Sequence, residues 1–156
     1  ELLRDNKFVR EHYQARFKHI LVDEFQDTNN IQYAWLRMMA GPECHVMIVG
    51  DDDQSIYGWR GAKVENIEKF TLEFPSVNTI RLEQNYRSTK TILEASNTLI
   101  ANNAERMGKE LWTDGVVGEP ISVYSAYNEV DEARFAVNKI KEWQDKGGAL
   151  KDAAMR

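Results

Sequence analysis

Cysteine and histidine are scarce in this sequence, which excludes the sites that depend on them. The 156 residues include one cysteine, Cys44, so no internal disulfide can form. The three histidines, His12, His19 and His45, lack the spacing of zinc ligands. Long apolar runs are also missing, because no stretch approaches the roughly 18 apolar residues of a membrane-spanning helix. We therefore expect a protein of a reducing, intracellular setting that is not integral to a membrane.

An excess of positive charge is missing as well. The net charge of −5 argues against a protein that coats nucleic acid by bulk charge, although a local groove could still bind it. Aromatic residues make up 10% of the chain, which excludes disorder as its main state. The sequence starts ELLRDNKFVR, without a secretory signal, and we interpret this start as the inside of a helix in an excised fragment.

The apolar pattern predicts helices and strands in alternation, which is typical of parallel α/β layers. We expect a helical piece over residues 2–17. Short apolar runs predict strands over 19–22, 45–49, 78–82 and 120–124. Helices are expected over 27–40, 64–72 and 89–103, and from Asn128 to the glycine pair 147–148.

Two carboxylates follow the first predicted strand. Asp23 and Glu24 stand at its carboxyl end, where open α/β sheets bind ligands. Asp23 could hold Mg²⁺, and Glu24 could polarise an attacking water. Taken alone, the segment 20–24 is also compatible with two surface or helix-capping carboxylates.

The loop after the second predicted strand reads GDDDQSIYGWRGA over residues 50–62. Gln54 offers an amide that can sense a phosphate oxygen or an attacking water. Tyr57, Trp59 and Arg60 have the composition of a site that stacks single-stranded nucleic acid. The alternative is that Trp59 is a core aromatic and the aspartates form a solvated turn.

A third segment, RLEQNYRS over residues 81–88, lies at a predicted junction of strand and helix. An arginine at a helix start opposes the helix dipole, so Arg87 needs another reason to be there. A phosphate charge is such a reason, and Tyr86 could stack on a nucleobase. An ordinary surface arginine beside a half-buried tyrosine is the alternative.

Together these segments resemble superfamily 1 DNA helicases of the UvrD, PcrA and Rep type. DEFQDT at 23–28, GDDDQSIYGWRGA at 50–62 and LEQNYRS at 82–88 are similar to helicase motifs II, III and IV, in the same order and spacing. The similarity runs from about His19 to Asp145 and includes KELWTDG and EPISVYSAYNEVDEARF. For this resemblance to be accidental, the alternatives given above for the three segments would all have to hold at once.

The resemblance implies a nucleotide site that takes ATP and Mg²⁺. Asp23 would take part in Mg²⁺ coordination, and Glu24 would be the catalytic base toward water. Gln54 would contact the γ-phosphate region. Tyr86 would pack on adenine, and Arg87 would reach the γ-phosphate as an arginine finger does.

The resemblance also implies a binding site for single-stranded DNA. Trp59 would stack on a base, with Tyr57 and Arg60 lining that contact. The short distance in sequence from Gln54 to Trp59 would couple hydrolysis to strand movement. Single-stranded DNA, DNA junctions and repair proteins are the partners that such a helicase implies, and the bacterial cytoplasm, associated with the nucleoid, is the implied location.

One motif that the family needs does not occur. The sequence holds no G-x-x-x-x-G-K-[ST] phosphate loop, so we expect the isolated chain to be inactive as an ATPase. The resemblance implies an incomplete RecA-like fold of the P-loop NTPase type. Residues 1–17 would end an inserted helical subdomain of the 1B type, residues 18–83 would be the later half of the first RecA-like motor domain, and residues 84–156 would begin the second.

Two hypotheses remain at this point. The chain is a fragment of an ATP-dependent 3′-to-5′ DNA helicase of repair, or it is a non-catalytic module that binds single-stranded DNA or docks to a protein. A third possibility is a helicase–nuclease subunit of the same superfamily, but the UvrD-like stretch between motifs III and IV argues against it. Because the second motor domain is short, we expect exposed apolar surface through which the fragment self-associates.

Overall fold

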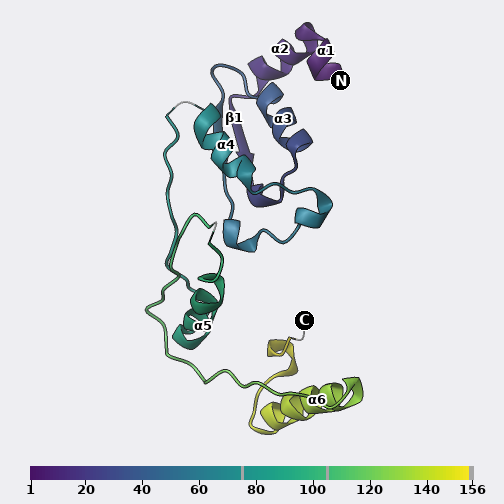
Figure 1. The fold of residues 1–156 in the computed structure, drawn as a ribbon, viewed down its shortest axis with the longest axis vertical. Coiled ribbons are helices and arrows are strands. Elements are labelled where there is room, and N and C mark those ends of the chain that lie inside the picture. Colours follow the sequence, from purple (N-terminus) through teal and green to yellow (C-terminus); the bar gives the residue numbers. More distant parts are fainter. Residues whose placement is uncertain (75, 105, 155–156) are drawn as a thin grey trace. The chain divides into compact units, whose positions relative to one another are not determined.

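A computed structural model describes residues 1–74, 76–104 and 106–154 (Figure 1). The chain forms two compact units, Glu1–Val116 and Val117–Arg156. The first unit contains the only sheet found among the described residues, and it carries all of the candidate site residues. The second unit contains α6 (Glu129–Asp145) and the 3₁₀ turn η4 (Leu150–Asp152).

Two helices occupy the start of the chain, where the sequence predicted one helical piece. Helix α1 covers Leu2–Asp5 and α2 covers Lys7–Arg16. Asn6 separates them, because its backbone is extended (φ −117°) and its side chain accepts a hydrogen bond from the Val9 amide at 3.1 Å. An asparagine that caps a new helix competes with continuation of the previous one, which explains the division.

The central sheet consists of two parallel strands, as the alternating pattern predicted. Strand β1 (His19–Val22) pairs with β2 (His45–Ile48), and Ile20 lies opposite Val46. Helix α3 (Asn30–Met39) connects them and begins with the expected cap. Asn29 accepts bonds from the amides that start the helix, and Gln32 accepts one from the Asn29 amide, which is a capping box.

The hydrophobic core lies on one face of this sheet. Phe25, Tyr33 and Leu36 are buried there together with Phe70 of α4 (Glu65–Glu73). Alternate strand residues pack against this cluster, and they are Ile20, Val22, Val46 and Ile48. The other face is exposed, with Leu21 at 67% and Met47 at 62%. Parallel sheets normally bury both faces, so one covered face does not by itself establish RecA-like layers.

The predicted strands over 78–82 and 120–124 are wrong. Both segments are described, and neither has a strand assignment. Leu82 is 82% exposed and Val123 is 93% exposed, so these apolar residues have no covering layer. A strand forms only where another strand supplies its hydrogen bonds, and the described part of the chain offers these two segments no such partner.

Helix α5 (Lys90–Ile100) follows the third motif and buries Leu93. It is shorter at both ends than the predicted span 89–103. Asn128 caps α6 by accepting a bond from the Asp131 amide, and α6 ends at Asp145 before Gly147, whose φ is 95°. These features confirm the cap and the glycine stop that the sequence indicated. None of the described helices has the length and apolar character needed to cross a membrane.

Candidate functional site

The carboxyl ends of β1 and β2 lie side by side and carry the first two motifs. Because the strands are parallel and in register, Asp23 and Glu24 emerge next to the segment that starts at Gly50. The pairing continues beyond the strands, since the Val49 amide donates to Val22 at 2.8 Å and the Phe25 amide donates to Val49 at 3.0 Å. The structure thus brings the two motifs to one edge of the sheet, as predicted.

The turn after β1 has an unusual backbone at Glu24. Its φ of 49° and ψ of 44° place it in the left-handed region, which residues with a Cβ adopt rarely. The Asp23 carboxylate accepts a hydrogen bond from the Glu24 amide at 2.9 Å. Both carboxylates are exposed to solvent. Left-handed backbone in such residues costs about 1–3 kcal/mol and is found at ligand sites, so the surroundings must hold this turn in place.

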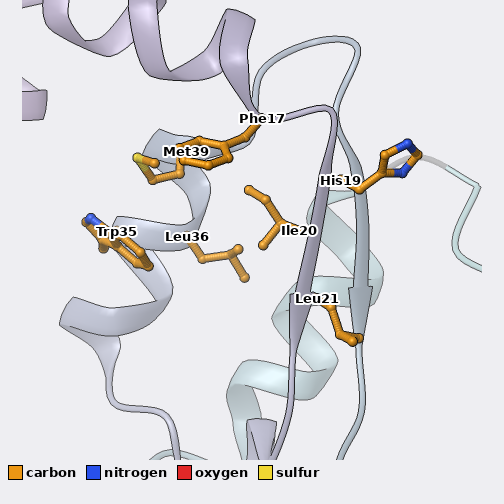
Figure 2. Close-up of a pocket in the computed structure, with 7 residues that line it drawn as sticks. All are labelled: Phe17, His19, Ile20, Leu21, Trp35, Leu36 and Met39. Atoms are coloured by element: carbon orange, nitrogen blue, oxygen red, sulfur yellow. The ribbon is translucent and has the colours of Figure 1, made fainter.

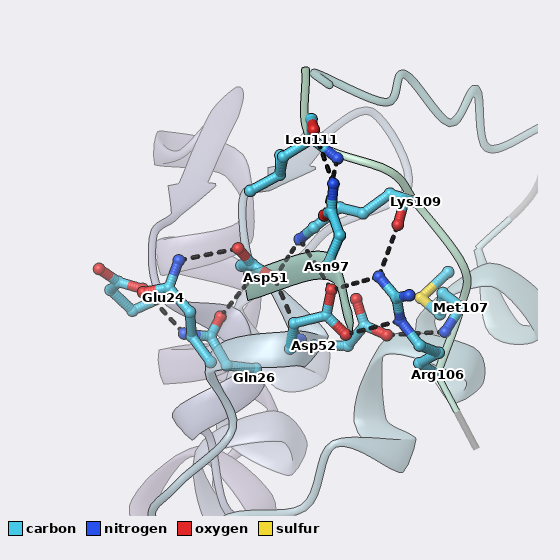
Figure 3. Close-up of polar contacts among 11 residues, drawn as sticks. Glu24, Gln26, Asp51, Asp52, Asn97, Arg106, Met107, Lys109 and Leu111 are labelled. Carbon is cyan, nitrogen blue, oxygen red and sulfur yellow. Dashed lines mark hydrogen bonds and ion pairs between the residues drawn. The ribbon is translucent and has the colours of Figure 1, made fainter. Parts of the chain in front are cut away.

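Gln26 holds the turn from inside. Its side chain is 1% exposed, and its Nε2 donates to Glu24 Oε2 at 2.8 Å while its Oε1 accepts from the Asp51 amide at 3.0 Å (Figure 3). Sequence reasoning missed this residue. The available signal was a long polar side chain in a short turn directly after a buried strand, a place where buried amides find backbone partners.

The far end of the second motif is anchored to the same turn. Asn29 and Ala62 form an isolated bridge, and the Lys63 amide donates to the Thr28 carbonyl at 2.9 Å. Asn66, fully buried in α4, donates to the same carbonyl at 3.1 Å. Residues 50–62 therefore form a loop whose two ends are both fixed to residues 22–29.

Inside that loop, two of three consecutive aspartates form ion pairs with downstream basic residues. Arg106 makes two bonds to the Asp53 carboxylate, at 3.0 and 2.8 Å, and Lys109 pairs with Asp51 (Figure 3). Gln54 Nε2 also donates to Asp51, at 2.8 Å. Burial raises the pKa of Asp51, but the bonds from Lys109 and Gln54 outweigh it, so this pKa lies below its ordinary value.

These ion pairs correct the interpretation of the aspartates as a solvated turn. The Asp53 and Arg106 side chains are only 13% and 17% exposed. The third aspartate, Asp52, accepts from the Met107 amide at 2.7 Å. The bond to Asp53 raises the pKa of Arg106 above its ordinary value. More than fifty residues separate these partners in sequence, so no local pattern indicated them.

The aromatic part of the loop is exposed. Trp59, on the short turn η3 (Gly58–Arg60), is 76% exposed, so the alternative that it is a core aromatic is wrong. The Arg60 guanidinium lies 4.6 Å from the centroid of the Trp59 ring and 5.2 Å from that of Tyr57. The two ring centroids are 6.4 Å apart. The three side chains form one polarised, open surface of the kind on which bases stack.

The third motif is ordered by its own side chains. Asn85 Oδ1 accepts from the amides of Arg87 and Ser88, at 2.9 and 2.7 Å, and thereby fixes the backbone that carries Arg87. Tyr86 is 86% exposed, and its hydroxyl donates to Gln84 at 2.7 Å. Both Tyr86 and Arg87 are exposed, so the half-buried tyrosine of the alternative reading is wrong.

The structure does not join the third motif to the other two. Among the described residues, no hydrogen bond or ion pair connects Tyr86 or Arg87 to the first motif or to Gln54, which sits in the short turn η2 (Asp52–Gln54). The motif is instead held by residues around 112, since the Asn85 amide donates to the Trp112 carbonyl at 2.7 Å. A contact of Tyr86 or Arg87 with the first two motifs therefore stays a prediction.

Two family models match nearly the whole chain. The UvrD/REP helicase N-terminal domain matches residues 1–75, and the UvrD-like helicase C-terminal domain matches residues 80–155. The chain, with its parallel strand pair and motif-bearing strand ends, belongs to the UvrD/REP helicase family. This confirms the family resemblance carried by the three motifs.

Individual relatives agree with this assignment. DNA helicase II of Salmonella typhimurium and that of Escherichia coli are each 66% identical over 155 residues, or 99% of this chain. The ATP-dependent DNA helicase PcrA of Staphylococcus aureus is 50% identical over 147 residues, or 94% of this chain. The chain spans about a fifth of the length of these relatives, 22% of the first two and 20% of the third.

Proposed function

We propose that the chain is part of an ATP-dependent 3′-to-5′ DNA helicase that translocates on single-stranded DNA in repair. One observation carries this proposal. The anchored loop starts beside the exposed carboxylates after β1, and it bears both Gln54, which donates to Asp51, and the exposed Tyr57–Trp59–Arg60 surface. A loop fixed at both ends transmits displacement between a nucleotide site and a DNA site better than a free one. The relatives' names support ATP and DNA as the ligands.

The residues after β1 fit the roles that ATP hydrolysis needs. Glu24 presents an exposed carboxylate and would act as the base toward the attacking water. Asp23 is oriented by the Glu24 amide and would hold Mg²⁺, an ion that suits one carboxylate together with water ligands. When Mg²⁺ is bound together with ATP, it neutralises part of the phosphate charge. Gln54 would contact the γ-phosphate, Tyr86 the adenine, and Arg87 the phosphate charge that develops in the reaction.

The domain organisation follows from the same proposal. Residues 1–17 would end an inserted helical subdomain, residues 18–83 would belong to the first RecA-like domain, and residues 84–156 would begin the second. Support comes from the two family models, which meet between residues 75 and 80. Because the sequence holds no phosphate loop, we expect no ATP turnover by the 156 residues alone.

DNA-stimulated ATP hydrolysis by the full-length protein tests the proposal. We expect single-stranded DNA to stimulate hydrolysis strongly, and we expect Glu24→Gln and Arg87→Ala each to lower kcat by two orders of magnitude or more, as removal of a base or an arginine finger does. Arg4→Ala is a control, since the Arg4 side chain is exposed and, among the described residues, pairs only with its neighbour Asp5. An ATP hydrolysis rate that single-stranded DNA does not change, or full activity in Glu24→Gln, would refute the proposal.

A non-catalytic module that binds single-stranded DNA or docks to a protein is the second candidate. The exposed Tyr57–Trp59–Arg60 surface favours it, because stacking one base contributes roughly 1–3 kcal/mol without any nucleotide. This candidate predicts tight, salt-sensitive DNA binding by the isolated chain that Trp59→Ala abolishes. Trp35→Ala, at an exposed tryptophan of α3, is the matched control.

We also propose that the isolated chain self-associates through its uncovered apolar surface. An apolar hollow beside β1 has a volume of about 270 Å³ and is lined by residues of β1 and α3, among them Ile20, Trp35 and Met39 (Figure 2). Leu21 and Met47 add exposed apolar area on the sheet. A monodisperse monomer in light scattering that binds no hydrophobic dye would contradict this.

A further inference from the structure

Gln26 and Asn66 are the two buried polar side chains found among the described residues, and they serve different segments. Asn66 donates to Thr28, a backbone position away from the carboxylates. Gln26 lies directly between Glu24 and Asp51, each of which follows a strand of the sheet (Figure 3). It therefore touches the proposed base on one side and the start of the second motif on the other.

The orientation of the Gln26 amide is fixed by its two partners. Nε2 donates to the Glu24 carboxylate and Oε1 accepts from the Asp51 amide. Turning the amide over would set its oxygen against the carboxylate and its NH₂ group against an N–H donor. A buried side chain does not tolerate two such unpaired contacts, so one orientation is strongly preferred.

The Glu24 carboxylate, in turn, depends on Gln26 for its position. Glu24 is exposed, and among the described residues only Gln26 donates a hydrogen bond to its carboxylate. That bond occupies Oε2, and no described residue donates to Oε1 of this exposed side chain. Without the bond, a long exposed side chain would sample several rotamers, and a base must be held in place to work well.

We propose that Gln26 is a positioning residue that holds the Glu24 carboxylate in place and links it to the Asp51 amide at the start of the loop. The inference rests on the proposed function, in which Glu24 is the base toward water. Because Asp51 also accepts from Gln54 at 2.8 Å, a displacement of Gln54 reaches the Glu24 carboxylate through two residues only, Asp51 and Gln26. The base is thereby coupled to the loop that carries Trp59.

The test uses DNA-stimulated ATP hydrolysis by the full-length protein carrying Gln26→Glu. This change keeps the shape of the side chain and the acceptor for the Asp51 amide, but it replaces the donor to Glu24 with a second carboxylate. We expect kcat to fall about ten- to hundredfold, the usual effect of losing an orienting partner, while KM for ATP stays within about twofold. Gln26→Met, which is similar in length and uncharged, repeats the test if the buried carboxylate prevents folding.

Gln32→Glu is the matched control, since Gln32 uses its Oε1 as an acceptor in the capping box and a glutamate can do the same. It should hydrolyse ATP like the wild type. The second control is the double variant Glu24→Gln/Gln26→Glu. If Gln26 acts through Glu24, this variant has the same residual rate as Glu24→Gln alone. A further loss of about tenfold would mean that Gln26 supports the structure only, and the inference would be wrong.

The inference and the proposed function fail in different ways. If Glu24→Gln is inactive while Gln26→Glu and Gln26→Met keep the wild-type kcat, the helicase function stands and the inference is overturned. If KM rises together with the loss in kcat, Gln26 shapes the nucleotide site generally, and the inference is again overturned. If the wild-type protein does not hydrolyse ATP at all, both the proposed function and the inference are wrong.

Discussion

Replacing Gly50 with alanine should destabilise the chain, because a Cβ at this position has no room. The added atom would lie 2.8 Å from Gln26 Oε1, 3.3 Å from the Phe25 nitrogen and 3.4 Å from the Gln26 nitrogen. Two of these neighbours are backbone atoms of the turn after β1. The third belongs to a buried side chain that already accepts the Asp51 amide. None of them can retreat without breaking a contact at the site.

The expected cost is that of overpacking a tight interior, about 1–3 kcal/mol of unfolding free energy. Gly58→Ala is the matched control, because its Cβ would meet nothing within 4 Å and its φ is not positive. At such a position alanine is neutral or stabilises by up to about 1 kcal/mol, through the unfolded state. Only the Gly50 substitution is therefore predicted to lower the unfolding free energy.

Urea unfolding of the 156-residue chain, followed by circular dichroism, measures both substitutions. We expect the midpoint to fall for Gly50→Ala and to stay or rise for Gly58→Ala, with unchanged slopes. Equal midpoints for Gly50→Ala and the wild type would show that Gly50 does not approach the turn after β1 as closely as the structure has it. The arguments about Gln26 would then lose their geometric basis.

Three further predictions concern other parts of the chain. Burial and the hydrogen bond to Glu73 raise the pKa of Tyr33 to about 12, so its contribution to stability is complete below about pH 10 and is lost as the pH rises towards 12. Tyr33→Phe should therefore lower the unfolding free energy by about 1–2 kcal/mol near pH 8, measured from urea midpoints. Between pH 10 and 12 the variant should lose less stability than the wild type does. Trp59→Ala should leave the urea midpoint within about 0.5 kcal/mol of the wild type, because the ring is exposed, yet weaken single-stranded DNA binding by the full-length protein about tenfold. Arg106→Leu should lower the unfolding free energy by about 2 kcal/mol, because it leaves the mostly buried Asp53 carboxylate without its bidentate partner, and an unchanged urea midpoint would contradict this.

Local sequence signals predicted much of the fold because their physical causes are local. The caps at Asn29 and Asn128 depend on neighbouring amides, and both are confirmed. The two strands that flank α3 were predicted from apolar runs, and their parallel pairing is confirmed. The run over 78–82 has the same appearance, but a strand also needs a partner, and sequence periodicity does not supply one.

In the candidate site, too, the sequence predicted the local features and missed those that depend on tertiary packing. The motifs located Asp23, Glu24 and the loop after β2, because strand ends are visible in the sequence. They did not reveal that Gln26 is buried with its amide between two motifs, since burial depends on packing. Nor did they reveal the partners of the aspartates, because Arg106 reaches Asp53 across 53 positions. Contacts of that kind arise only from the tertiary fold.

The ion pairs in the loop also bear on where a cation would bind. Carboxylate oxygens of the three consecutive aspartates lie within 4.8 Å of one another, a spacing that suits a metal ion. Lys109 and Arg106, however, already place two positive charges against Asp51 and Asp53. A divalent ion there would have to displace these partners and repel their charge. Asp23 is exposed and has no basic partner among the described residues, so electrostatics supports the proposed Mg²⁺ position at the end of β1 rather than one at the aspartate cluster.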